Sequence, residues 1–192
     1  MYKRCVTEQS AKRQRELEQG LLEVMAVRRF EDISITDLCL SLDIPRKAFY
    51  RYFSSREGAL YALIDHTLMD FTVDFFAEGF QATYSTLERF FAFWRQQEKL
   101  LNALERNELS GLLVQRAILL ATEEEMFPVL FFPERHRGHQ KQVALFVVSG
   151  MMAMVGQWHR DHFRNTPQQM AQITAHLLSR PLFSTPKQIY TE

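Results

Sequence analysis

The chain has 192 residues, 46% of them hydrophobic, which suits one compact unit or two small ones that share a core. Lysine and arginine balance aspartate and glutamate at 23 each, and this zero net charge argues against simple electrostatic adhesion to nucleic acid. The first residues are too polar for a signal peptide, and no apolar run approaches the ~18 residues of a membrane span, so a cytoplasmic protein without membrane contact is expected.

Residues 10–29 carry apolar side chains at helical spacing and predict an amphipathic scaffold helix. The first 15 residues hold five cations and one anion. Two interpretations of residues 1–15 stay open: a basic arm that reaches DNA phosphates or a minor groove, and a solvated, frayed terminus.

A helix-turn-helix candidate follows this segment. Ser34, with Asp37 three residues later, approximates a capping box and opens a short helix. Residues 42–45 supply Asp43, which tolerates turns, and a proline that fixes φ, so the helix is expected to end there. A second short helix is predicted over residues 46–52, and two short helices across so tight a turn are typical of a helix-turn-helix.

The second helix of this pair has two different faces. Phe49 and Phe53 lie one turn apart on one side, whereas Lys47 and Arg51 point the opposite way and Tyr50 stands at the edge. A helix that buries phenylalanines and presents cations suits a DNA major groove, where arginine and lysine reach guanine edges and phosphates.

The run FYRYFSSREGAL, residues 49–60, resembles the corresponding part of the TetR-family transcriptional regulators, and the resemblance covers about residues 15–65. Asp43, Pro45 and Lys47–Ala48 depart from the family pattern, which leaves the expected fold intact and the base preference open. The resemblance implies an all-α fold of about nine helices. It places a helix-turn-helix DNA-binding domain over residues 1–54 and a helical ligand-binding and dimerisation domain over residues 55–192.

Position by position, the resemblance also implies contacts with double-stranded operator DNA. The implied residues are Ser34, Thr36, Arg46, Lys47, Ala48, Tyr50 and Tyr52, with Arg56 at a phosphate.

Downstream, apolar spacing and capping residues predict further helices and no convincing strand. They are expected to begin near Ser55, Ser85, Glu98, Leu112, His139 and Thr166. Residues 127–138, with two prolines and a glycine, are expected to form a loop. The run over residues 143–148 is rich in β-branched side chains and has strand propensity within an expected helix.

The middle of the chain is unusually rich in aromatic residues. By resemblance, this region encloses a pocket for a small, often apolar molecule. The candidate ligand-binding residues are Phe71, Phe75, Phe90, Trp94 and Phe127. The alternative is that aromatic rings at helical spacing simply fill the core.

Small residues recur between Ser149 and Trp158, and small side chains allow helices to approach closely. In the family that the chain resembles, the last two long helices pair with their copies in a homodimer. The expected interface residues are Gly150, Ala153, Met154, Gln157 and Trp158. A helix buried within one subunit is the alternative.

No enzyme, metal site or cofactor is expected. His136 and His139 are three residues apart, as are His159 and His162, yet no cysteine or carboxylate completes a ligand set. Neither a phosphate-cradling glycine loop nor a nucleophile elbow is present.

The sequence therefore predicts a ligand-responsive regulator, a repressor that a small, largely apolar molecule releases from a pseudo-palindromic operator. The alternative is a helical, dimeric interaction protein of the same fold without ligand-controlled DNA binding. Four side chains that suit contact with DNA favour the regulator: Lys47, Tyr50, Arg51 and Arg56. A protein that had lost DNA binding could carry acidic or apolar residues at these positions.

Overall fold

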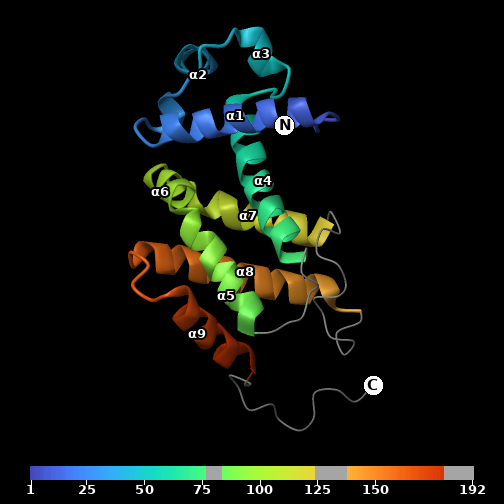
Figure 1. Ribbon diagram of the computed structural model, residues 1–192, viewed down its shortest axis with the longest axis vertical. Helices are drawn as coiled ribbons and strands as arrows, with labels where there is room; N and C mark the ends of the chain where they lie inside the picture. Colours follow the sequence, from blue (N-terminus) through green and yellow to red (C-terminus); the bar gives the residue numbers. More distant parts are fainter. Residues whose placement is uncertain (77–83, 124–137, 180–192) are drawn as a thin grey trace.

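The computed structural model describes residues 1–76, 84–123 and 138–179, and within these ranges it contains nine α-helices and no strand. Three helices form one end of the molecule: α1 (Glu8–Met25), α2 (Ile35–Ser41) and α3 (Arg46–Tyr50). A 3₁₀ turn, η1 (Phe30–Asp32), links the first two. The long helix α4 (Arg56–Phe76) runs from this end into the rest of the molecule (Figure 1).

The other five helices form the larger part of the structure. They are α5 (Tyr84–Gln96), α6 (Glu98–Arg106), α7 (Ser110–Glu123), α8 (Gln140–Arg160) and α9 (Pro167–Ser179). α5 packs against α9 and α7 against α8, while α4 contacts both α1 and α7. The prediction of an all-α fold with an N-terminal helix-turn-helix and about nine helices is confirmed.

The helix-turn-helix is held together by a core between α1, α2 and α3. Leu21, Leu38 and Phe49 are fully buried in it. Gly20 allows the end of α2 to approach α1, because a Cβ atom at this position would lie 2.0 Å from Leu42 Cδ2. A side chain at this position would force the Leu42 side chain to move.

The turn between α2 and α3 depends on Asp43. Its φ of 48° lies in the left-handed region, which a short polar side chain tolerates better than a bulky one. The chain then turns back so that the Ile44 N–H donates to Cys39 O at 3.0 Å. The prediction that Asp43 can serve where a glycine is usual is confirmed.

The capping residues mark two helix starts as predicted. At α2, the Asp37 N–H donates to Ser34 Oγ at 3.0 Å and the Ser34 N–H donates back to the Asp37 carboxylate at 3.1 Å. At α9, Thr166 and Gln169 make the equivalent pair of bonds, at 2.8 and 3.2 Å. Each pair satisfies two N–H groups that a helix start would otherwise leave unpaired.

Other boundaries differ from the prediction. The first helix ends at Met25 instead of residue 29, and α7 begins at Ser110 instead of Leu112. The run 143–148 is helical despite its β-branched residues, so its local strand propensity does not decide its structure.

α3 ends at Tyr50, earlier than predicted, because the following residues pair with residues 1–3. The Lys3 N–H donates to Tyr52 O at 2.9 Å, and the Ser54 N–H donates to Met1 O at 3.1 Å. Tyr2 and Phe53 form an isolated antiparallel bridge. The backbone of residues 1–3 is therefore held in place, while the Lys3 side chain is exposed.

A buried polar seam lies where α1 packs on α4. Glu18 is fully buried, and its two carboxylate oxygens lie 2.9 and 3.0 Å from Nδ1 of His66. Burial raises the pKa of the Glu18 carboxyl, and the hydrogen bond to His66 opposes this rise.

We predict that Glu18→Gln removes part of the pH dependence of stability. Because the folded-state pKa of Glu18 is raised, the stability that this group contributes is present below its unfolded pKa and is lost as the pH rises through the folded pKa. As the pH rises above about 4, the ordinary range of a carboxyl pKa, the wild-type melting temperature is expected to fall relative to that of the variant. A difference between the two proteins that stays constant with pH would contradict this.

Candidate functional site

The exposed side of α3 carries two cations and a phenol. Arg46, Lys47 and Tyr50 are all exposed. The Arg46 Nη2 donates to the Tyr50 hydroxyl oxygen at 3.2 Å, and its guanidinium lies 5.8 Å from the Tyr50 ring centre. The hydroxyl hydrogen of Tyr50 is thereby left to donate outward, for example to a phosphate oxygen.

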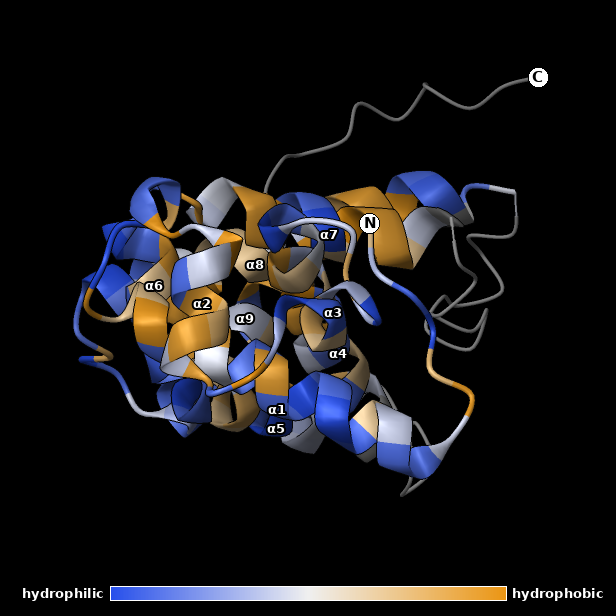
Figure 2. Ribbon diagram, turned by 90° about the horizontal axis from the view of Figure 1, so that it is seen from above, coloured by the Kyte–Doolittle hydropathy of each residue, from blue (hydrophilic) through white to orange (hydrophobic). Residues whose placement is uncertain are grey.

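The opposite side of α3 anchors it to the core. Phe49 and Phe53 are both fully buried, with ring centroids 5.1 Å apart. The two faces inferred from the sequence are therefore present. Viewed from this end of the molecule (Figure 2), α1 is largely hydrophilic.

The candidates on and beside α2 and α3 differ in exposure. Thr36 and Ser34 are exposed, and the Ser34 hydroxyl is bonded to the Asp37 carboxylate at 2.6 Å. Ala48 is half-buried. Tyr52 retains only 7% exposure, so most of its side chain belongs to the core.

Arg56 has a structural role in this geometry. Its Nη1 donates to three backbone carbonyls, those of Phe30, Glu31 and Ile33, at 2.7–2.9 Å. Its Nε donates to Glu57, and the guanidinium stacks 4.9 Å from the Phe30 ring centre. The guanidinium thus holds the turn η1 before α2, and the phosphate contact implied by resemblance stays a prediction.

The candidate ligand-binding aromatics that the structure describes pack against one another. Phe71 and Phe90 have ring centroids 5.3 Å apart, and Phe90 lies 6.4 Å from Trp94. The Trp94 indole N–H is buried and has no acceptor within the described part of the chain. Phe127 and the side chain of Phe75 lie outside the described residues.

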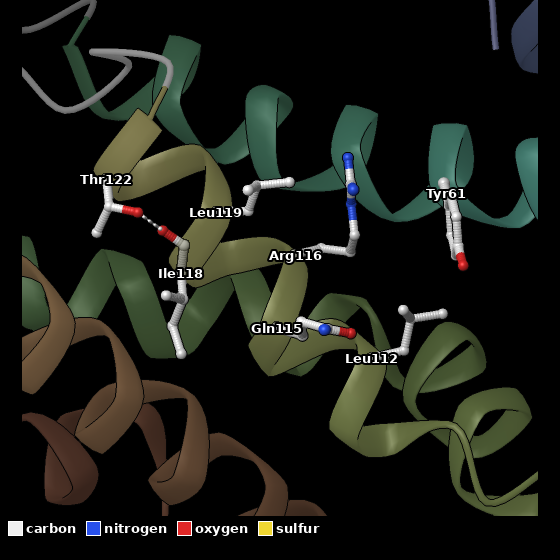
Figure 3. A pocket seen from close by; sticks show the side chains of 7 residues that line it. All are labelled: Tyr61, Leu112, Gln115, Arg116, Ile118, Leu119 and Thr122. Atoms are coloured by element: carbon white, nitrogen blue, oxygen red, sulfur yellow. Dashed lines mark hydrogen bonds between the residues drawn. The ribbon is translucent and has the colours of Figure 1, made fainter. Parts of the chain in front are cut away.

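Two cavities lie away from this aromatic cluster. One, of about 330 Å³, lies between α4 and α7 (Figure 3). Its lining residues are Tyr61, Leu112, Gln115, Arg116, Ile118, Leu119 and Thr122. The other, of about 640 Å³, is an open and largely apolar hollow between α8 and α9.

The surface of α8 and α9 around the larger cavity is strongly apolar. The exposed fraction is 72% for Phe146, 48% for Leu145 and 54% for Leu178. Gly150 faces open space, because a Cβ atom there would meet nothing within 4 Å.

The predicted dimerisation residues fall into two groups. Gly150, Ala153 and Gln157 are exposed, and Met154 is half-buried at the edge of the cavity. Trp158 is different, because it belongs to the core of the subunit: its ring packs 5.5 Å from Phe91 and 4.8 Å from Phe163. Only 3% of Trp158 is exposed, which leaves little of it for a partner subunit.

One contact that links distant helices was not anticipated from the sequence. Arg116 of α7 donates two hydrogen bonds to the carboxylate of Asp65 on α4, which also accepts one from the Tyr2 hydroxyl. The available signal was an aspartate within the apolar run of α4, since a buried acid must be paired. The sequence did not indicate which cation would pair with it.

The described residues contain no group of three or more histidine, cysteine, aspartate or glutamate side chains that could hold a metal ion. His159 is instead engaged by Asn102 and Glu105 at 2.8 and 2.9 Å, and His136 lies outside the described residues. No helix among the described residues is long and apolar enough to cross a membrane.

No protein-family model matches the sequence, and none of the curated proteins does. Solved structures are similar in fold. The TetR-family repressor AlkX from a Dietzia species, implicated in biodegradation of n-alkanes, is 14% identical with a TM-score of 0.56, over 86% of this chain and 92% of that one. The fatty acid degradation regulator FadR from Bacillus halodurans is 14% identical with a TM-score of 0.59, over 88% and 95%.

A TetR-family transcriptional regulator from Streptomyces coelicolor is 19% identical with a TM-score of 0.53, over 88% of this chain and 81% of that one. All three are described as repressors or regulators and none as an enzyme. At this level of identity the similarity concerns the fold. The protein has the fold of the TetR-family transcriptional regulators.

Proposed function

We propose that this protein is a DNA-binding transcriptional regulator whose recognition helix is α3. The observation that supports this most directly is the division of α3 into a buried phenylalanine face and an exposed face of Arg46, Lys47 and Tyr50. A short helix of this kind, held against two others, can place its exposed side chains in a major groove. The solved structures of similar fold are regulators, which agrees with this role.

The side chains proposed to touch DNA are those that the fold leaves accessible. Arg46 and Lys47 suit guanine edges and phosphates, and the Tyr50 hydroxyl suits a phosphate. Ser34, Thr36 and Ala48 are proposed to contact DNA beside them. Tyr52 and Arg56 are proposed to support this surface from behind, the first in the core and the second through η1.

The protein is proposed to act as a homodimer through α8 and α9. These helices expose Phe146, Leu145 and Leu178 on one face, more apolar surface than scattered exposed side chains usually produce. Gly150 and Ala153 on this face would let a second copy approach closely. A two-fold dimer would read two half-sites related by the same symmetry, hence a pseudo-palindromic operator.

DNA binding is proposed to respond to a small, largely apolar molecule that releases the repressor from its operator. α4 supports this proposal, because the same helix packs against α1 of the helix-turn-helix and against α7. A ligand that favours one arrangement of α4 would change the spacing of the two recognition helices.

Two substitutions on α3 test the proposal after the bound sequence has been selected from a random DNA pool. Lys47→Ala is expected to cost about 1–3 kcal/mol of binding free energy and to relax the base preference at one position of each half-site. Tyr50→Phe is expected to weaken binding evenly across sequences, because a lost phosphate bond carries no base information.

Fluorescence anisotropy with the selected duplex and with single-base variants measures both effects. Lys99→Ala, which removes an exposed cation on α6, is the matched control and should leave affinity unchanged. If both α3 variants bound like the wild type, α3 would not be the recognition helix. Failure to select any sequence would favour an interaction protein of the same fold.

A further inference from the structure

The cavity between α4 and α7, called here the α4–α7 groove, has the size and lining of a small-molecule site (Figure 3). Its volume of about 330 Å³ falls at the lower end of the range of ligand pockets. Tyr61 contributes from α4, and six residues of α7 form the rest. Among these seven lining residues Arg116 is the charged one.

The polar groups of the groove are the Arg116 guanidinium, which only donates hydrogen bonds, and hydroxyl and amide groups, which both donate and accept. Arg116 lies over the ring of Tyr61, at 5.3 Å from its centre, and Gln115 is exposed beside it. Arg116 binds Asp65 through Nε and Nη2, so a ligand carboxylate in the groove would share the same guanidinium and compete with Asp65 for its charge. Leu112 and Leu119 supply apolar contact. This lining suits a molecule with one anionic group and an apolar body of a few carbon atoms.

Arg116 also belongs to a network that reaches beyond the groove. The Asp65 side chain is 1% exposed and accepts hydrogen bonds from Arg116 Nε at 2.7 Å and from the Tyr2 hydroxyl at 2.8 Å. A buried carboxylate depends strongly on its partners, since loss of one leaves charge unpaired in a medium of low dielectric. The position of Tyr2 is therefore linked to the position of Arg116.

Residues 1–3 in turn hold the end of the recognition helix. The carbonyl of Tyr52 accepts from Lys3, and the N–H and hydroxyl of Ser54 donate to Met1 O at 3.1 and 2.7 Å. The packing here is close, because a Cβ atom on Gly58 would lie 2.5 Å from Met1 O. A continuous series of contacts thus runs from the α4–α7 groove through Asp65 and Tyr2 to the end of α3.

We propose that the α4–α7 groove binds a small carboxylate with an apolar body, and that this ligand draws the Arg116 guanidinium away from Asp65. With Arg116 engaged by the ligand, Asp65 keeps the Tyr2 hydroxyl alone, and residues 1–3 are held less firmly against Tyr52 and Ser54. The regulatory part of this inference rests on the DNA binding proposed above. By linkage, operator DNA would weaken ligand binding by the same factor.

Binding is tested by calorimetry on the full chain with sodium octanoate as the probe and 1-octanol as its uncharged counterpart. Octanoate is expected to bind at least about tenfold more tightly than octanol, because octanol cannot form a charge-assisted bond with Arg116. Leu119→Trp, which fills the groove and leaves Arg116 and Asp65 intact, should lower octanoate affinity by about tenfold or more. Arg116→Gln should do the same, and Lys99→Gln is the control for general loss of a cation.

The proposed site is overturned if neither octanoate nor 4-phenylbutyrate binds the wild-type protein. It is also overturned if octanol binds as tightly as octanoate, or if Leu119→Trp binds octanoate like the wild type. These measurements need no DNA, so they test the ligand site independently of the proposed DNA binding.

The coupling is tested by amide hydrogen exchange in peptides that cover residues 1–5 and 50–55. Saturating octanoate is expected to speed exchange in both peptides of the wild type, because the Lys3 and Ser54 amides lose protection. In Tyr2→Phe, which lacks the hydroxyl bonded to Asp65, octanoate should change exchange little. Octanoate binding without faster exchange in the wild type would overturn the link through Asp65.

Discussion

Replacing Asp65 by alanine is expected to lower the free energy of unfolding by about 3–5 kcal/mol, the usual cost of removing one partner of a buried ion pair. The substitution leaves the Arg116 guanidinium, whose side chain is 19% exposed, without its carboxylate and the Tyr2 hydroxyl without its acceptor. The guanidinium stays charged in the variant, because the ordinary pKa of arginine lies far above neutral pH, so it cannot escape the penalty by losing its proton. Chemical denaturation of the variant and the wild type measures the difference.

A matched double variant separates the loss of the pair from the loss of packing. In Asp65→Leu with Arg116→Met, both charges are replaced by apolar groups of similar size, and most of the stability is expected to return. Together with the single variants Asp65→Leu and Arg116→Met, the double variant completes a double-mutant cycle that isolates the pair energy. If the single variant Asp65→Ala were as stable as the wild type, water would replace the Asp65 carboxylate beside Arg116 without a loss of stability.

Replacing Phe146 by aspartate is expected to break the proposed dimer while leaving the subunit folded. Phe146 is 72% exposed within one subunit, so its loss removes little from the core. At the centre of an interface, burial of an aspartate in place of an aromatic ring costs about 2–4 kcal/mol or more, at least about thirtyfold in the dimer dissociation constant. Sedimentation equilibrium measures the dimer, and DNA affinity should fall with it because the two half-sites are no longer bound together.

Val27→Asp is the matched control, because Val27 is an apolar residue with 70% exposure on the helix-turn-helix side of the molecule. It should leave the dimer intact. If Phe146→Asp stayed dimeric with an unchanged melting temperature, the α8–α9 face would not be the interface. If instead its melting temperature fell sharply, Phe146 would contribute to the fold of the subunit.

The helix-turn-helix could be predicted almost completely from local sequence. The spacing of Phe49 and Phe53 defines a buried face, Ser34 and Asp37 close a capping box, and Asp43 permits the left-handed turn. These features act between residues at most a few positions apart, so the information lies within the segment itself.

The aromatic region could be predicted only in part. The spacing of Phe71, Phe90 and Trp94 indicated helices with a shared apolar side, and the structure packs these rings together. Whether such rings fill a core or surround a ligand depends on the distances between the helices. The spacing of residues along the sequence does not determine these distances. Two cavities lie elsewhere, one between α4 and α7 and the other between α8 and α9.

The sequence by itself determined the all-α class, the two short helices with their turn, and the opposite faces of α3, because each follows from local spacing and capping. Only the tertiary structure decided that Tyr52 is buried, that Arg56 holds η1, and that Asp65 pairs with Arg116. A long polar side chain selects its partner from whatever the packed helices bring within about 3 Å, and that choice is made by the relative placement of whole elements.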